Sequence, residues 1–100
     1  MKPPEFLDVD PRTLHLPWSR RDGADPLKLS RQISQHGKST VGMQPPTVYR
    51  SADGELVLND GVTRATRVAK LLPGTLIRVE VIGKLKQRGA STPTVGERLP

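Results

Sequence analysis

Residues 55–82 constrain the fold most, because they combine three patterns in a fixed order. A β-rich run at 55–59 leads through Gly61 into an apolar stripe with helical spacing, which ends at Pro73 and Gly74. An alternating apolar run at 76–82 follows. This order predicts a strand, a helix over 62–72 and a second strand. Such a unit normally crosses over right-handed and leaves its two strands parallel in one sheet. The stripe consists of Ala65, Val68, Ala69 and Leu72.

Shorter patterns on the N-terminal side predict the other elements. A strand is expected at 6–9, and a helix is expected at 26–36 because Asp25 suits its N-cap and Gly37 its end. The run at 47–50 and the run at 55–59 are separated by four turn-forming residues, which predicts an antiparallel hairpin. The expected fold class is therefore α+β, a small mixed β-sheet with two helices.

The last residues hold half of the excess positive charge. The formal net charge is +6, and residues 84–100 contain four basic residues and one acidic residue, a net charge of +3. This segment is also rich in proline and glycine and poor in apolar residues. We therefore expect a single domain at 1–83 and a disordered basic tail at 84–100. The remaining charge is compatible with a nucleic-acid partner without requiring one.

Other classes of protein are excluded or disfavoured by composition. The chain has no cysteine, so it forms no disulfides and no zinc sites with thiolate ligands. It contains neither a signal-peptide core nor an apolar run long enough for a membrane span, which predicts a cytoplasmic protein without a membrane partner. The two histidines, His15 and His36, have no acidic neighbours at metal-ligand spacing, so we expect no metal site.

The turn between the run at 55–59 and the following helix is the candidate binding site. Unpaired N–H groups of a first helical turn attract anions, and Gly61 allows the backbone to approach a ligand closely. Thr63 can donate a hydroxyl, and Arg64, Arg67 and Lys70 recur at spacings of three. In the alternative interpretation, Asp60 caps the helix, consumes these N–H groups, and leaves the basic residues as an ordinary solvated face.

Three segments resemble the N-terminal domain of the ParB/sulfiredoxin superfamily, and together they span about four-fifths of the chain. They are residues 7–11 (LDVDP), residues 33–37 (ISQHG) with 44–48 (QPPTV), and residues 60–65 (DGVTRA). The resemblance implies a fold that handles nucleotides or nucleic acid. Members of the superfamily include cytidine-triphosphate-binding partition clamps, ATP-using sulfinic-acid reductases, a small amino-acid kinase and proteins labelled nucleases.

Position by position, the resemblance implies roles for six residues. Those expected to contact phosphates are Gly61, Thr63 and Arg64, and those expected to border the nucleotide are Gly37, Gln44 and Pro45. The chain departs from the family at Val62, where sulfiredoxins carry their catalytic cysteine and partition proteins a glutamate, and at Thr63, where partition proteins carry an arginine. It also lacks the helix-turn-helix domain of the partition proteins. Because Val62 stands where sulfiredoxins carry their catalytic cysteine, sulfiredoxin chemistry is excluded.

Catalytic candidates are few. Glu55 and Asp60 flank the candidate site and could bind magnesium or act as a base, although a turn or surface role is the simpler interpretation. Trp18, beside two arginines, could stack on a base or fill the core. No residue is assigned a catalytic role.

Three functions remain open. The first is a module that binds a nucleotide or nucleic-acid phosphate, with ATP or CTP and magnesium as candidate ligands. The second is a small magnesium- and ATP-dependent phosphotransferase or nuclease. The third is a protein-interaction module that has lost nucleotide binding and whose partner the sequence leaves open.

Overall fold

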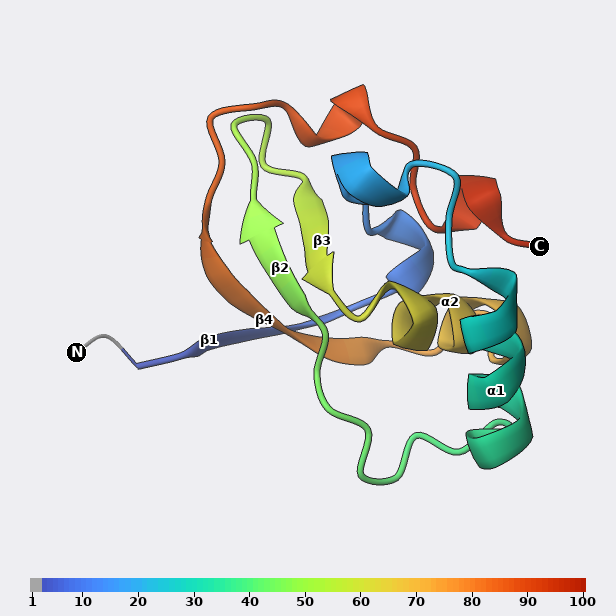
Figure 1. Ribbon diagram of the computed structural model, residues 1–100. Coiled ribbons are helices and arrows are strands. Elements are labelled where there is room, and N and C mark those ends of the chain that lie inside the picture. The colour runs from blue at the N-terminus through green and yellow to red at the C-terminus, as the bar shows by residue number, and fades with distance from the viewer. Residues whose placement is uncertain (1–2) are drawn as a thin grey trace.

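A computed structural model describes residues 3–100 and contains one four-stranded sheet with the strand order β1-β4-β2-β3 (Figure 1). The strands are β1 (Glu5–Val9), β2 (Thr47–Arg50), β3 (Leu56–Asp60) and β4 (Ile77–Lys84). The pairs β1·β4 and β2·β3 are antiparallel, and the central pair β2·β4 is parallel. The sheet is therefore mixed, and with two helices it confirms the expected α+β class and the hairpin between β2 and β3.

The expected parallel arrangement of the strands around the second helix is wrong. Strand β2 lies between β3 and β4 and runs parallel to β4 but antiparallel to β3, so β3 and β4 run in opposite directions. The local patterns identified both strands and the helix between them. They carried no information on which edge of the hairpin would accept β4, because strand order depends on pairing between distant residues.

Both helices begin and end at residues suited to those positions. Helix α1 (Pro26–His36) starts at Asp25, whose carboxylate accepts hydrogen bonds from the N–H groups of Leu27 and Lys28. It has the predicted bounds, and Gly37 is its C-cap residue. Helix α2 (Val62–Leu71) starts at Gly61 and packs against α1. Its end differs by one residue from the prediction.

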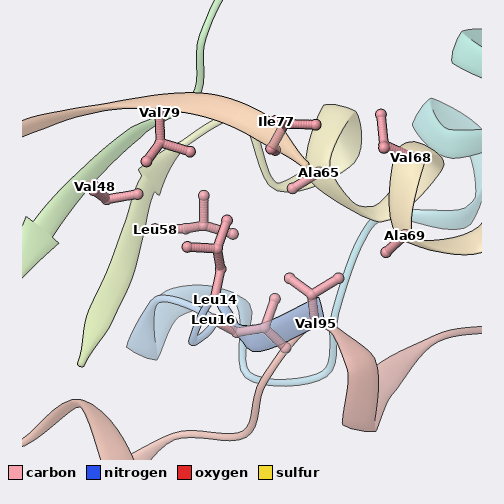
Figure 2. Close-up of a cluster of buried hydrophobic side chains, with 10 residues drawn as sticks. All are labelled: Leu14, Leu16, Val48, Leu58, Ala65, Val68, Ala69, Ile77, Val79 and Val95. Carbon is pink, nitrogen blue, oxygen red and sulfur yellow. The ribbon is translucent and has the colours of Figure 1, made fainter. Parts of the chain in front are cut away.

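The core lies where the sheet, α2 and the loop after β1 meet (Figure 2). Helix α2 packs on α1 and on the 3₁₀ turn Pro11–Thr13, and its buried side chains join branched side chains of the strands in one cluster. Figure 2 shows leucines from the loop after β1 pointing into the same cluster as the strand residues. The buried residues of the cluster are Leu14, Leu16, Val48, Leu58, Ala65, Val68, Ala69, Ile77, Val79 and Val95.

The segment at 85–100 completes this core, so the expectation of a disordered tail is wrong. The side chain of Val95 is 1% exposed, and its backbone N–H donates to the carbonyl of Leu14. The hydroxyl of Thr92 donates to the carbonyl of Leu16. Composition failed here because only a few side chains of the segment enter the core. The segment is held mostly by backbone hydrogen bonds, which no hydropathy pattern reports.

A buried histidine links this segment to the sheet. The ring of His15 is 3.6 Å from the Glu55 carboxylate through Nε2, and 2.6 Å from the Thr92 carbonyl through Nδ1. Its backbone bonds to β3, because the N–H of His15 donates to the carbonyl of Leu56 and the N–H of Leu58 donates to the carbonyl of His15. Within residues 3–100, no helix is long and apolar enough to cross a membrane.

Candidate functional site

A pocket of about 460 Å³ lies between α1 and the first turn of α2. Its walls come from three parts of the chain: the 3₁₀ turn at Trp18–Arg20 with its neighbours, one face of α1, and the junction of β3 with α2. This volume is in the range of ligand-binding pockets, roughly 300–1,000 Å³. The lining residues are Pro17, Ser19, Arg20, Ala24, Asp25, Lys28, Arg31, Gln32, Gln35, Asn59, Asp60, Gly61, Val62, Thr63 and Arg64.

The first turn of α2 opens into this pocket without a side-chain cap. Its N-cap residue is Gly61, at φ +100°, and no side chain accepts a hydrogen bond there. The alternative in which Asp60 caps the helix is therefore wrong. Asp60 is the last residue of β3, and its carboxylate lies 3.6 Å from Nη2 of Arg64 instead. The first turn of α2 contains no acidic residue and accepts no side-chain cap, so its N–H groups are not bonded to a protein carboxylate.

Gly61 also determines where the Arg64 side chain can lie. A Cβ on Gly61 would come within 2.7 Å of Cβ of the buried Pro46 and within 2.9 Å of Nη2 of Arg64. The guanidinium therefore lies against the bare backbone of the turn, with its side chain 22% exposed. This contact is possible only at a residue without a side chain.

Basic side chains outnumber acidic ones around the pocket. Four lining residues are cationic (Arg20, Lys28, Arg31 and Arg64), and the two carboxylates are those of Asp25 and Asp60. Hydrogen bonds from the backbone N–H groups of Lys28 and Leu27 lower the pKa of Asp25, so this carboxylate is already engaged by α1. The pocket thus has the charge and the donors to hold an anion.

A smaller pocket of about 210 Å³ adjoins the first, and the two share Gln32 and Arg64. Its other lining residues come from the end of α1, the loop that follows it, and α2: His36, Ser39, Val41, Gly42, Met43, Gln44 and Arg67. Arg67 is only 2% exposed, so the expectation of a solvated basic face is wrong at this position. Burial also lowers the pKa of Arg67. The helical pattern missed this because the loop at 38–44 covers a face that does not contact the sheet.

The structure brings some of the predicted site residues together. Gly61, Thr63 and Arg64 line the larger pocket, whereas Gln44 and Arg67 line the smaller one. The Gly37 carbonyl accepts a hydrogen bond from Nη1 of Arg67. Half-buried Pro45 lines neither pocket. Lys70 is exposed and likewise lines neither pocket.

The two predicted carboxylates are separated. Glu55 precedes β3 and contacts His15, whereas Asp60 ends the same strand at the pocket. The residues described contain no group of three or more His, Asp or Glu side chains that could hold a metal ion.

Sequence reasoning missed the wall formed by α1 and the 3₁₀ turn. Asp25, Lys28, Gln32 and Gln35 are spaced by three and four residues, a signal that these polar side chains share one helix face. Trp18 is 41% exposed, outside the core, and stands between Pro17 and Ser19, which line the pocket.

Comparison of the sequence with protein-family models finds no match, and comparison with curated proteins finds none either.

Proposed function

We propose that this domain binds a phosphate-bearing ligand, a nucleoside phosphate, in the larger pocket. The observation that carries the proposal is the uncapped start of α2, which opens with Arg64 into a pocket rich in cations. Backbone N–H groups of the first turn would hold one phosphate, with the Thr63 hydroxyl and the Arg64 guanidinium as further donors. The resemblance to the ParB/sulfiredoxin superfamily supports the same residues and suggests ATP or CTP with magnesium.

The shape of the site favours a nucleotide over a nucleic-acid backbone. A phosphate backbone is usually bound along an extended basic surface, whereas here the cations gather around one concave pocket. Lys28 and Arg31 on α1 face the α2 start across this pocket, so they are placed to contact phosphates away from the helix end. We place this activity in the cytoplasm.

The proposal describes a binding module rather than a catalyst. Either Glu55 or Asp60 would have to serve a phosphotransferase or nuclease, but Glu55 contacts His15 at the other end of β3 and Asp60 pairs with Arg64. A lone exposed Asp60 could still complete the coordination of a magnesium ion brought by the nucleotide.

The test uses Arg64→Ala with Arg21→Ala as the matched control. Arg21 is exposed and adjacent to the lining Arg20, but it does not line the pocket, so both variants lose one positive charge in the same region. Loss of a charge-assisted hydrogen bond should cost about 1.5–3 kcal/mol. We therefore expect Arg64→Ala to weaken nucleotide binding by roughly 10- to 150-fold, and Arg21→Ala to weaken it much less.

Two readouts are available for ATP, ADP and CTP titrations with magnesium. Trp18 is the sole tryptophan and stands between two lining residues, so its fluorescence reports on the pocket. Backbone amide shifts at residues 60–67 report on the start of α2. If no nucleotide shifts these amides, the proposal is wrong and an interaction module becomes the better interpretation.

A nucleic-acid ligand would give a different result. Binding would then weaken with salt, with a log–log slope of roughly −0.9 for each duplex phosphate contacted. A titration of duplex and single-stranded DNA at several salt concentrations distinguishes this ligand from a free nucleotide.

A further inference from the structure

Buried polar atoms without hydrogen-bond partners gather at one place in the described part of the chain. They are Oε1 of Gln32, Nε of Arg64 and Nε of Arg67, and all three residues line the smaller pocket. A buried donor or acceptor without a partner is unfavourable, so native structures hold few of them. The three residues, two of them cationic, therefore have unused hydrogen-bonding capacity next to this pocket.

Arg67 is the most deeply buried of the three. Its Nη1 donates to the carbonyls of Gly37 and Ser39 at 2.7 and 2.8 Å, and its Nη2 lies 3.5 Å from the sulfur of Met43. These contacts attach the loop after α1 to α2. They satisfy part of the guanidinium and leave Nε without a partner.

No carboxylate balances this buried charge. The pocket lining contains two arginines and neither Asp nor Glu, and no ion pair involves Arg67 among residues 3–100. The carbonyl of Gly37, at the end of α1, supplies only a partial negative charge. Because arginine stays protonated in proteins, the charge persists, and buried charges are normally paired.

We propose that the smaller pocket is a second anion site, which binds a phosphate-type oxyanion between Arg64 and Arg67. A pocket of about 210 Å³ is below the usual range for whole ligands and suits one small group. Arg64 and Arg67 both line the pocket, so their guanidinium groups supply positive charge and N–H donors, and the lining Gln32 adds an amide donor. The site goes beyond the proposed function because it adds Arg67 and the loop after α1, and it shares Arg64 with the larger pocket.

The anion has two possible sources, and the experiment separates them. Inorganic phosphate is titrated into the full chain while backbone amide shifts are recorded, and the titration is repeated with saturating ATP and magnesium. The amides of Ser39, Gly42 and Gln44 report on the smaller pocket, and those of Lys28 and Arg31 report on the larger one. Saturating shifts at the first group support the second site.

The repeat identifies the source of the anion. If ATP abolishes the phosphate response, the oxyanion is a further group of the same nucleotide. If the response persists, it is free phosphate. Phosphate shifts confined to the larger pocket would overturn the second site and leave the proposed function intact. Shifts confined to the smaller pocket, with no nucleotide bound at residues 60–67, would support the second site and overturn the proposed function.

A carboxylate supplied by the protein itself gives the sharper test. Met43→Glu places an anion beside Nη2 of Arg67, and Met43→Gln is the neutral control of the same length. We expect Met43→Glu to weaken phosphate binding at the smaller pocket by at least about tenfold and to raise Tm, since it pairs the buried charge. The control should bind phosphate as the wild type does.

A second variant guards against misfolding of the first. Gln44→Glu puts a carboxylate on the wall of the same pocket at an exposed residue, where the fold should tolerate it. It should weaken phosphate binding in the same direction. Unchanged phosphate affinity in both folded glutamate variants would overturn the proposal.

Discussion

Replacement of Gly61 by alanine tests how the larger pocket is built. The φ angle of +100° disfavours any residue with a side chain, and an added Cβ would lie 2.7 Å from Cβ and 3.0 Å from Cα of Pro46. Pro46 is fully buried and cannot move away without disturbing the core. The backbone strain and the overpacking each cost roughly 1–3 kcal/mol. We therefore expect Gly61→Ala to lower the free energy of unfolding by about 2–6 kcal/mol.

The matched control is Gly74→Ala. Gly74 also has a positive φ, +84°, but a Cβ there would meet nothing within 4 Å, so this variant measures the backbone cost alone, roughly 1–2 kcal/mol. Urea denaturation followed by circular dichroism compares the two. In a thermal scan, 1 kcal/mol corresponds to about 4–8 °C for a domain of 60–100 residues, so Gly61→Ala should lower Tm by roughly 10–50 °C.

The difference in stability between Gly61→Ala and Gly74→Ala tests the contact between the turn and Pro46. Equal losses of stability would refute the inferred contact between the turn and Pro46, because only the backbone would then matter. The Cβ also displaces Nη2 of Arg64, which lies 2.9 Å from its position. The folded fraction of Gly61→Ala should therefore bind nucleotide more weakly than the Gly74→Ala variant does.

Three further predictions concern stability away from the pocket. Val95→Ala removes buried methyl groups and should cost roughly 1–3 kcal/mol in urea denaturation, whereas no loss would show that the C-terminal segment does not complete the core. Hydrogen bonds from the Ser51 hydroxyl and from backbone N–H groups of that segment hold the pKa of Asp53 well below its ordinary 3.8. The ionised Asp53 carboxylate therefore stabilises the fold above pH 3.8, and this stabilisation is lost as the pH falls below that value. The wild type should be more stable than Asp53→Asn at neutral pH, and the difference should shrink in acid. A difference that stays constant with pH would contradict this. Glu5→Gln should barely change Tm even though its carboxylate lies 2.6 Å from Arg50, because this half-exposed ion pair is screened, and a large loss that shrinks in high salt would argue otherwise.

Local patterns predicted the elements well because each depends on neighbouring residues. The bounds of α1 follow from the capping Asp25 and from Gly37, and the start of α2 follows from Gly61. The position of β2 between β3 and β4 depends on pairing across the chain, which periodicity does not report. Val95 enters the core from a segment whose composition resembles a linker.

The candidate site likewise has one part that the sequence predicts and one part that depends on distant packing. Gly61, Thr63 and Arg64 are consecutive or nearly so, and their common position at a helix start was predictable. The opposite wall, with Lys28 and Arg31, faces them only because α1 packs on α2. The burial of Arg67 was likewise hidden, since an i, i+3 spacing cannot show which helix face a loop will cover.

The pairing of β1 with β4 has a consequence for the order of folding. Glu5 pairs with Val81, and Leu14 contacts the segment around Val95 through its backbone carbonyl. During synthesis, the first strand thus has no pairing partner until β4 has been made, and the core around Leu14 stays incomplete until the segment beyond β4 follows. Such non-local contacts slow folding and leave apolar residues exposed meanwhile. The chain should therefore fold late and cooperatively, and a nascent chain that stops after α2 should be captured by chaperones.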